Sequence, residues 1–171
     1  MNNYITVGIL SDSHGFLDPR IADTVNQCDH IVHAGDIFNA GVLQQLKPRK
    51  NLVAVAGNND YPSFWRKCEA HIVRALPPKD TLDLPGGLLV VEHGHRLGNH
   101  PDHKQLRSEY VTARLVVYGH THHRIIDQDA EPWVVNPGAS GKVRTHGGPS
   151  CLVLHASEDK WEIETILFKK S

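Results

Sequence analysis

The chain has 171 residues, 40% of them hydrophobic and 22% charged, and its formal net charge is -1, which suits one soluble domain spanning residues 1–171. The near-neutral charge argues against a dedicated nucleic-acid-binding surface, and the apolar runs are far shorter than the ~20 residues needed to cross a bilayer. The three cysteines are widely spaced, so we expect free thiols rather than a disulfide framework, in a cytoplasmic protein that does not enter a membrane.

The first half of the chain alternates strands with helices. A helix is expected to begin at Asp18-Pro19, because aspartate caps a helix and proline suits its first position. A second helix should cover residues 40–46 and end before Pro48. The strands around them, rich in valine, isoleucine and leucine, are expected at residues 5–11, 30–34 and 52–56. This order predicts parallel strands joined by right-handed crossovers.

The second half changes to short strands separated by prolines and glycines. One polar helix is expected at residues 101–110, and the sequence leaves open whether it covers a site as a lid. The expected strands, largely antiparallel, are 71–76, 81–84, 88–91, 115–118, 125–127, 133–136, 151–155 and 161–168. Two sheets packed face to face with helices outside would bury both patterns, so the expected fold is an α/β two-sheet sandwich flanked by helices.

Five apolar runs end in residues that can bind metals. The carboxyl ends of neighbouring strands open into one crevice, so we expect these side chains to meet there. The candidates are Asp12, His14, Asp36, Asn58, His93, His120 and His122. Two ions with four protein ligands each, sharing one carboxylate, would use all of them. Mixed imidazole, carboxylate and amide ligands suit Mn, Fe, Zn, Ni or Mg.

The motifs at these positions resemble a known family. Asp-x-His, Gly-Asp, Gly-Asn-x-Asp, His-Gly-His and Gly-His-Thr-His, in this order, are similar to the calcineurin-like metallophosphoesterases. The short chain and Asn-Pro-Gly at 136–138 resemble the small bacterial and archaeal phosphodiesterase branch, which is also similar to the retromer scaffold subunit of eukaryotes. The resemblance implies a four-layer αββα fold and a site with two divalent ions, manganese being the first choice.

The resemblance also implies a role for each candidate. Asp36 would bridge the ions, and Asn58 and Asn59 would contact the substrate. The first ion would be bound by Asp12, His14, Asp36 and His122, and the second by Asp36, Asn58, His93 and His120. A hydroxide held between the ions would then attack the phosphorus atom.

The chain departs from the family pattern at Asn59, where many members have a histidine. Asparagine donates a hydrogen bond but cannot deliver a proton, so assistance to the leaving group should be weaker. His95 is the candidate for part of that role. Asp60 is expected to orient a neighbouring histidine rather than to bind metal. His33 is expected to pack or hydrogen-bond locally.

We therefore expect a phosphoesterase with two metal ions that hydrolyses a small phosphoester substrate, a diester rather than a monoester. A nuclease using the same centre is an alternative, although the sequence gives no positive sign of nucleic-acid binding. A protein-interaction scaffold with a residual metal site is the other alternative, and the presence of all seven candidate ligands argues against it. The sequence leaves a homodimer open.

Overall fold

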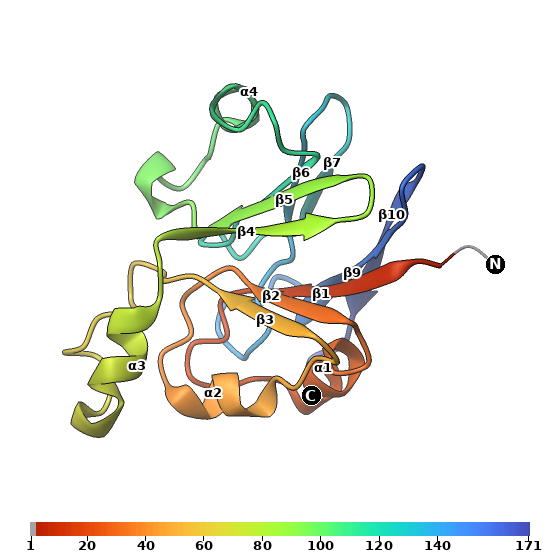
Figure 1. The fold of residues 1–171 in the computed structure, drawn as a ribbon. Coiled ribbons are helices and arrows are strands. Elements are labelled where there is room, and N and C mark those ends of the chain that lie inside the picture. The colour runs from red at the N-terminus through yellow and green to blue at the C-terminus, as the bar shows by residue number, and fades with distance from the viewer. Residues whose placement is uncertain (1–2) are drawn as a thin grey trace.

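Two five-stranded sheets lie face to face in this computed structural model, which describes residues 3–171 (Figure 1). In the first sheet, β1 pairs in parallel with β2, β2 pairs in parallel with β3, and β9 joins β1 and β10 in antiparallel fashion. Across the sheet the order is β10 (Trp161–Leu167), β9 (Ser150–Ala156), β1 (Ile5–Leu10), β2 (His30–His33) and β3 (Asn51–Ala54).

The second sheet is mixed as well. Its three central strands, β5, β6 and β8, are parallel, and the two edge strands are antiparallel to them. The order is β4 (Lys79–Leu84), β5 (Gly87–Glu92), β6 (Leu115–Val117), β8 (Trp133–Asn136) and β7 (Ile125–Asp127).

Helices cover the outer faces of both sheets (Figure 1). The helices α1 (Pro19–Val25) and α2 (Ala40–Gln45) lie below the first sheet, and α4 (His103–Glu109) lies above the second. The Asp18 carboxylate accepts from the Arg20 backbone N–H, so the predicted cap of α1 is confirmed. The remaining elements are α3 (Ala70–Ala75) and the short 3₁₀ turns η1 (Lys67–Glu69) and η2 (His95–Leu97).

Alternating side chains along the strands fill three apolar layers. In β1, Ile9 packs between the two sheets while Leu10 packs against α1 and α2. In β6, Leu115 joins the layer between the sheets, whereas Val116 packs with Leu106 of α4. Because Leu106 is fully buried there, α4 is part of the outer layer of the sandwich. The predicted two-sheet sandwich flanked by helices is confirmed.

Two predictions about the second half were wrong. Residues 71–76 form no strand, because all but the last belong to α3. Ile72 and Val73 of this helix, with Leu76 at its C-cap, pack into the apolar layer under the first sheet. The later strands are also not one antiparallel set, because β9 and β10 cross back to the first sheet. No helix among the described residues is both long and apolar enough to span a membrane.

Candidate metal centre

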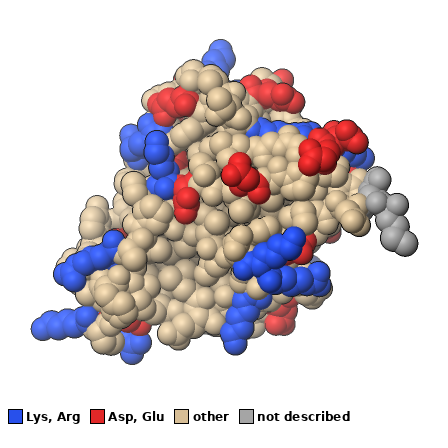
Figure 2. Space-filling model, viewed as in Figure 1, with Lys and Arg blue, Asp and Glu red and all other residues tan. Residues whose placement is uncertain are grey.

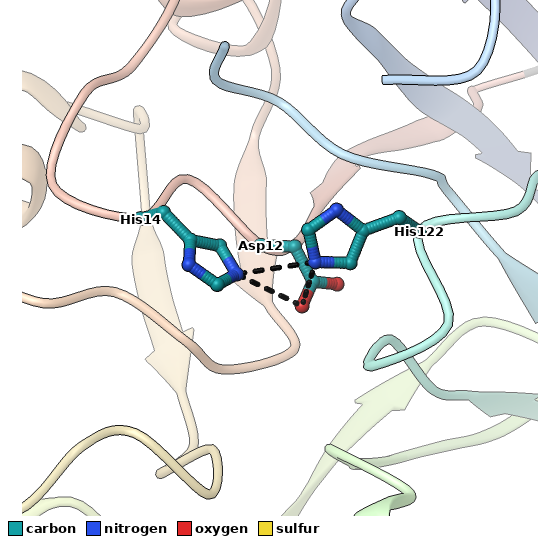
Figure 3. A group of neighbouring side chains, drawn as sticks. All are labelled: Asp12, His14 and His122. Carbon is teal, nitrogen blue, oxygen red and sulfur yellow. Dashed lines mark hydrogen bonds and ion pairs between the residues drawn. The ribbon is translucent and has the colours of Figure 1, made fainter. Parts of the chain in front are cut away.

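The first group of candidate ligands lies where the loops after β1 and β6 meet. Figure 3 shows the imidazoles of His14 and His122 facing each other beside the Asp12 carboxylate. The two Nε2 atoms are 3.1 Å apart, and His122 Nε2 lies 3.4 Å from Asp12 Oδ1. His14 Nε2 lies 3.8 Å from the same oxygen. These three atoms are close enough to share one metal ion.

The second group lies where the loops after β3, β5 and β6 meet. Asn58 Oδ1 is 3.0 Å from His93 Nε2 and 3.1 Å from His120 Nδ1. The two groups join at Asp36, whose Oδ2 lies 3.4 Å from His14 Nε2 and whose Oδ1 lies 3.4 Å from His93 Nε2. The structure therefore brings all seven predicted ligands together, with Asp36 between the two groups.

The backbone at this cluster is strained. Positive φ is uncommon for residues other than glycine and has an energetic cost, so several such residues together indicate a site that the fold holds in place. Backbone hydrogen bonds between neighbouring loops provide that hold, among them Asp12 N–H to Gly35 O at 3.0 Å and His14 N–H to Asp36 O at 3.0 Å. The cluster residues with positive φ are Asp12 (52°), His14 (46°), Asp36 (56°), His120 (67°) and His122 (62°).

Two of the candidate ligand histidines are oriented by backbone carbonyls. His93 Nδ1 donates to Ala34 O at 2.8 Å, and His122 Nδ1 donates to Val143 O at 2.8 Å. A proton on Nδ1 leaves the lone pair of the neutral ring on Nε2, which is the atom that faces the cluster. At His93 this lone pair would face the Asn58 carbonyl oxygen, and a metal ion between the two acceptors would satisfy both.

Only one of the two oxygens of the Asp12 carboxylate has hydrogen-bond donors among the described residues. Its Oδ2 accepts from Ser11 Oγ at 2.7 Å and from the His120 backbone N–H at 3.0 Å. Its Oδ1 is buried and has no hydrogen-bond donor among the described residues. A buried carboxylate oxygen without a partner is costly, and a bound cation would remove that cost.

The spacing of the cluster fits metal ligands. Two atoms that each lie ~2.1 Å from one ion, at angles of about 90–110°, are about 3.0–3.4 Å apart. Several pairs in both groups lie in this range, including His14 with His122 and Asn58 with His93. The residues therefore fit divalent ions in both groups by donor type as well as by spacing.

Charge and burial act against each other at Asp36 and His93. Burial works to raise the pKa of Asp36, but the His93 imidazole and hydrogen bonds from Asn59 outweigh it and hold this pKa well below its usual range. Burial works to lower the pKa of His93, but Asp36 and Asp12 outweigh it and raise this pKa. A cation in the site would take the place of the proton that these carboxylates attract to His93.

The remaining predicted residues have mixed outcomes. Asn59 turns toward Asp36: its backbone N–H donates to Oδ1 at 3.0 Å and its Nδ2 donates to Oδ2 at 2.9 Å. His95 is exposed, with its ring 5.5 Å from that of His93. His33 bonds locally, to Ser13 Oγ at 3.0 Å and to the Gly35 N–H at 3.1 Å.

The prediction for Asp60 was wrong, because its carboxylate binds no histidine. It accepts from the backbone N–H groups of Ile37, Phe38 and Gly57 and from Trp65 Nε1 at 2.8–3.2 Å. Asp60 therefore ties the loop after β3 to the loop after β2, which carries Asp36. A carboxylate six residues beyond the end of β3 can serve such a role as readily as it can orient a ligand.

Glycines in the motifs allow the loops to approach one another closely. A Cβ on Gly57 would lie 2.1 Å from Asp36 Oδ1 and 2.3 Å from the Asp36 backbone N. A Cβ on Gly119 would lie 2.0 Å from Ser11 Oγ and 2.7 Å from Asp12 Oδ2. Only glycine therefore leaves room for the Asp36 carboxylate at position 57 and for the Asp12 carboxylate at position 119.

Two neighbours of the cluster have no signal in the sequence. Phe38 packs its ring 4.8 Å from the His14 ring, and Arg144 Nη2 lies 3.2 Å from His122 Nε2. Both belong to loops rather than to the ends of apolar strands, so no pattern marked them. A cavity of about 550 Å³ also adjoins the second group, and its lining includes Lys79, His95 and Tyr110.

Comparisons with known proteins identify the family and the fold. A probable metallophosphoesterase of Methanocaldococcus jannaschii is 29% identical over 94% of this chain and 80% of its own length, and a phosphodiesterase of the same organism is 27% identical over 77% and 82%. A solved archaeal phosphodiesterase superposes with a TM-score of 0.71 at 23% identity, covering 96% of this chain and 100% of the other. A single mutant of Vps29 of Entamoeba histolytica gives a TM-score of 0.74 at 14% identity, with the same coverage. Residues 5–159 match the calcineurin-like phosphoesterase superfamily domain, and the chain therefore belongs to that superfamily.

Proposed function

We propose that the protein is a phosphodiesterase that uses two divalent metal ions. Asp12, His14 and His122 would bind the first ion, and Asn58, His93 and His120 the second, with Asp36 shared between them. The observation that carries the proposal is the buried Asp12 Oδ1, which has no donor among the described residues although three imidazole nitrogens lie within 3.9 Å. A cation bound by this oxygen would also take the lone pairs of the His14 and His122 nitrogens.

The chain's own residues would prepare this centre for phosphoester hydrolysis. Two adjacent divalent ions supply hydroxide near neutral pH and bind the phosphoryl oxygens. Asn59 holds both oxygens of Asp36 in place by its two hydrogen bonds. The carbonyls of Ala34 and Val143 fix the rings of His93 and His122 with Nε2 toward the centre. We propose manganese as the first choice of metal, with magnesium next.

A diester is the preferred substrate in this proposal for two reasons. The cavity of about 550 Å³ next to His93 and His95 has room for a second ester group. One relative of this chain carries the name phosphodiesterase. His95 lies on the cavity wall, so we assign it hydrogen-bond donation toward the leaving group. Asn59, in contrast, acts on the substrate through Asp36, since its amide is engaged there.

Two alternatives predict different results. A scaffold with a residual metal site would not need to keep seven candidate ligands, five of them at positive φ, so their presence in this chain supports the enzyme. A nuclease would need a basic path for the nucleic-acid backbone. On the face in Figure 2, lysines and arginines are interspersed with aspartates and glutamates rather than gathered into one basic field.

The test is hydrolysis of bis-p-nitrophenyl phosphate and of p-nitrophenyl phosphate, with manganese or magnesium added and again after chelation. We expect metal-dependent turnover with faster cleavage of the diester. Asp36→Asn and His122→Ala should abolish turnover, whereas the exposed control variants Asp83→Asn and His100→Ala should retain it. Absence of metal-dependent turnover of both compounds would refute the proposed function, and cleavage of the monoester alone would refute the substrate class.

A further inference from the structure

Arg144 lies on the loop between β8 and β9, and this loop is fastened to the candidate centre. His122 Nδ1 donates to the carbonyl of Val143, the residue before Arg144, at 2.8 Å. The Arg144 guanidinium then reaches the other nitrogen of the same ring, with Nη2 at 3.2 Å from His122 Nε2. Among the described residues, no other arginine or lysine hydrogen-bonds to a candidate ligand.

The local backbone indicates that this placement is held by the fold. Arg144 has a φ of 48°, and the carbonyl before it is fixed by His122. A bulky residue at positive φ is uncommon and strained, and such residues gather at functional sites. Three residues earlier in the same loop, Gly141 packs so closely that an added Cβ would lie 2.3 Å from Ser13 O. The loop therefore packs closely against the segment that carries Asp12 and His14.

The contact between Arg144 and His122 depends on a lone pair that the metal would use. Because Nδ1 of His122 holds the proton, Nε2 is the acceptor for Arg144 Nη2. When Nε2 binds a divalent ion, the guanidinium loses this acceptor and must find another. Divalent ions repel a neighbouring guanidinium, and an anion bound between the two charges turns this repulsion into attraction. A phosphoryl group bound at the centre supplies that anion.

The chemistry of the side chain fits this partner. The planar guanidinium presents paired N–H donors that match two phosphate oxygens, and it remains charged at every working pH. The amide of Asn59, at the position where a histidine would have been the donor, is engaged on Asp36. Arg144 is therefore the cationic donor next to the first group of ligands. The Arg144 side chain is exposed, so it can turn from His122 toward a bound anion.

We propose that Arg144 binds the non-bridging phosphoryl oxygens of the substrate on the side of Asp12, His14 and His122. This inference rests on the proposed function, and it adds to it a substrate-binding residue that the metal ligands do not supply. The phosphoryl oxygens gain negative charge during hydrolysis. Arg144 should therefore stabilise the transition state more than it stabilises the substrate complex.

The test is calorimetric titration of the manganese-loaded protein with inorganic phosphate, which needs no turnover. Arg144→Gln should raise the Kd for phosphate about tenfold or more, which corresponds to about 1.4 kcal/mol. Arg144→Lys should be intermediate, because lysine keeps the charge but loses the paired donors. The control is Lys142→Gln, which removes an equal charge two residues away and should leave the Kd unchanged. In the diester assay, Arg144→Gln should lower kcat about 10²-fold, as loss of one transition-state donor does.

Several results would overturn the inference. One is an unchanged phosphate Kd in Arg144→Gln with normal metal content. Another is an equal weakening in Lys142→Gln, which would show a general field rather than a contact. A third is loss of metal from both Arg144 variants, which would show that Arg144 only supports the loop. If the wild type binds phosphate through Arg144 but cleaves no ester, the proposed function fails while the binding role stands.

Discussion

Gly57 offers the sharpest test of how the fold positions the shared carboxylate. Replacing it by alanine adds one methyl group, and that carbon would lie 2.3 Å from the Asp36 backbone N and 2.1 Å from its Oδ1. Gly57 is not at positive φ, so the change adds no backbone strain of its own. The effect of Gly57→Ala is therefore a steric one, directed at Asp36.

The size of the effect follows from these distances. Ordinary contact begins at 3.4 Å, so the two loops must separate by roughly 1 Å. Overpacking of this kind costs typically about 1–3 kcal/mol of unfolding free energy. A displacement of ~1 Å at a catalytic site can cost about 10²-fold in rate. We therefore expect Gly57→Ala to lose both stability and nearly all diesterase activity.

The assay combines urea unfolding with and without manganese and turnover of bis-p-nitrophenyl phosphate. Metal at 100 times its Kd should stabilise the wild type by ~2.7 kcal/mol, and this gain should shrink in Gly57→Ala because Asp36 has moved. The matched control is Gly41→Ala in α2, where the nearest atom is the Asn39 side chain at 3.2 Å. Wild-type stability, metal gain and activity in Gly57→Ala would refute the steric argument.

Three further predictions concern the rest of the molecule. Asn59→Ala should lower diesterase kcat and weaken metal binding by removing the side-chain bond to Asp36, and an unchanged metal Kd would show that this bond is dispensable. In the folded protein one thiol per chain, Cys68, should react rapidly with Ellman's reagent, because the other two cysteines are buried; rapid reaction of all three would contradict the packing. Chiefly through its hydrogen bond to Arg107, Asp127 has its pKa lowered to about 2 from 3.8, so its contribution to stability is full above about pH 4 and is lost as the pH falls toward 2. Urea unfolding of Asp127→Asn should therefore differ most from the wild type at pH 6 and converge with it near pH 2, and a gap that does not depend on pH would argue against this pairing.

Most strands that precede the centre could be predicted because they are short runs of buried, mainly apolar residues that end abruptly in polar ones; β3, with two exposed residues, is the exception. β1 and β2 show this, since every residue of β2 is buried and Asp36 follows shortly after. Residues 71–76 misled the prediction, because a short apolar run does not distinguish a strand from one face of a helix. The return of β9 to pair with β1 is a long-range contact that no local periodicity encodes.

The candidate ligands could likewise be predicted from their place after strands, but their supporting contacts could not. The bonds from His93 to Ala34 and from His122 to Val143 use backbone carbonyls, which every residue carries. Arg144 approaches the centre from a loop whose path depends on close packing at Gly141. Such contacts arise only when distant loops meet, so the sequence holds no local sign of them.

Metal stoichiometry tests the central claim most directly. The purified full-length chain would be equilibrated with manganese, passed through a desalting column and measured by elemental analysis. The proposal predicts about two ions per chain in the wild type and a clear loss in Asp36→Asn, because that carboxylate is shared by both ions. Fewer than about one ion per chain in the wild type, or two ions retained by Asp36→Asn, would contradict a centre built on Asp36.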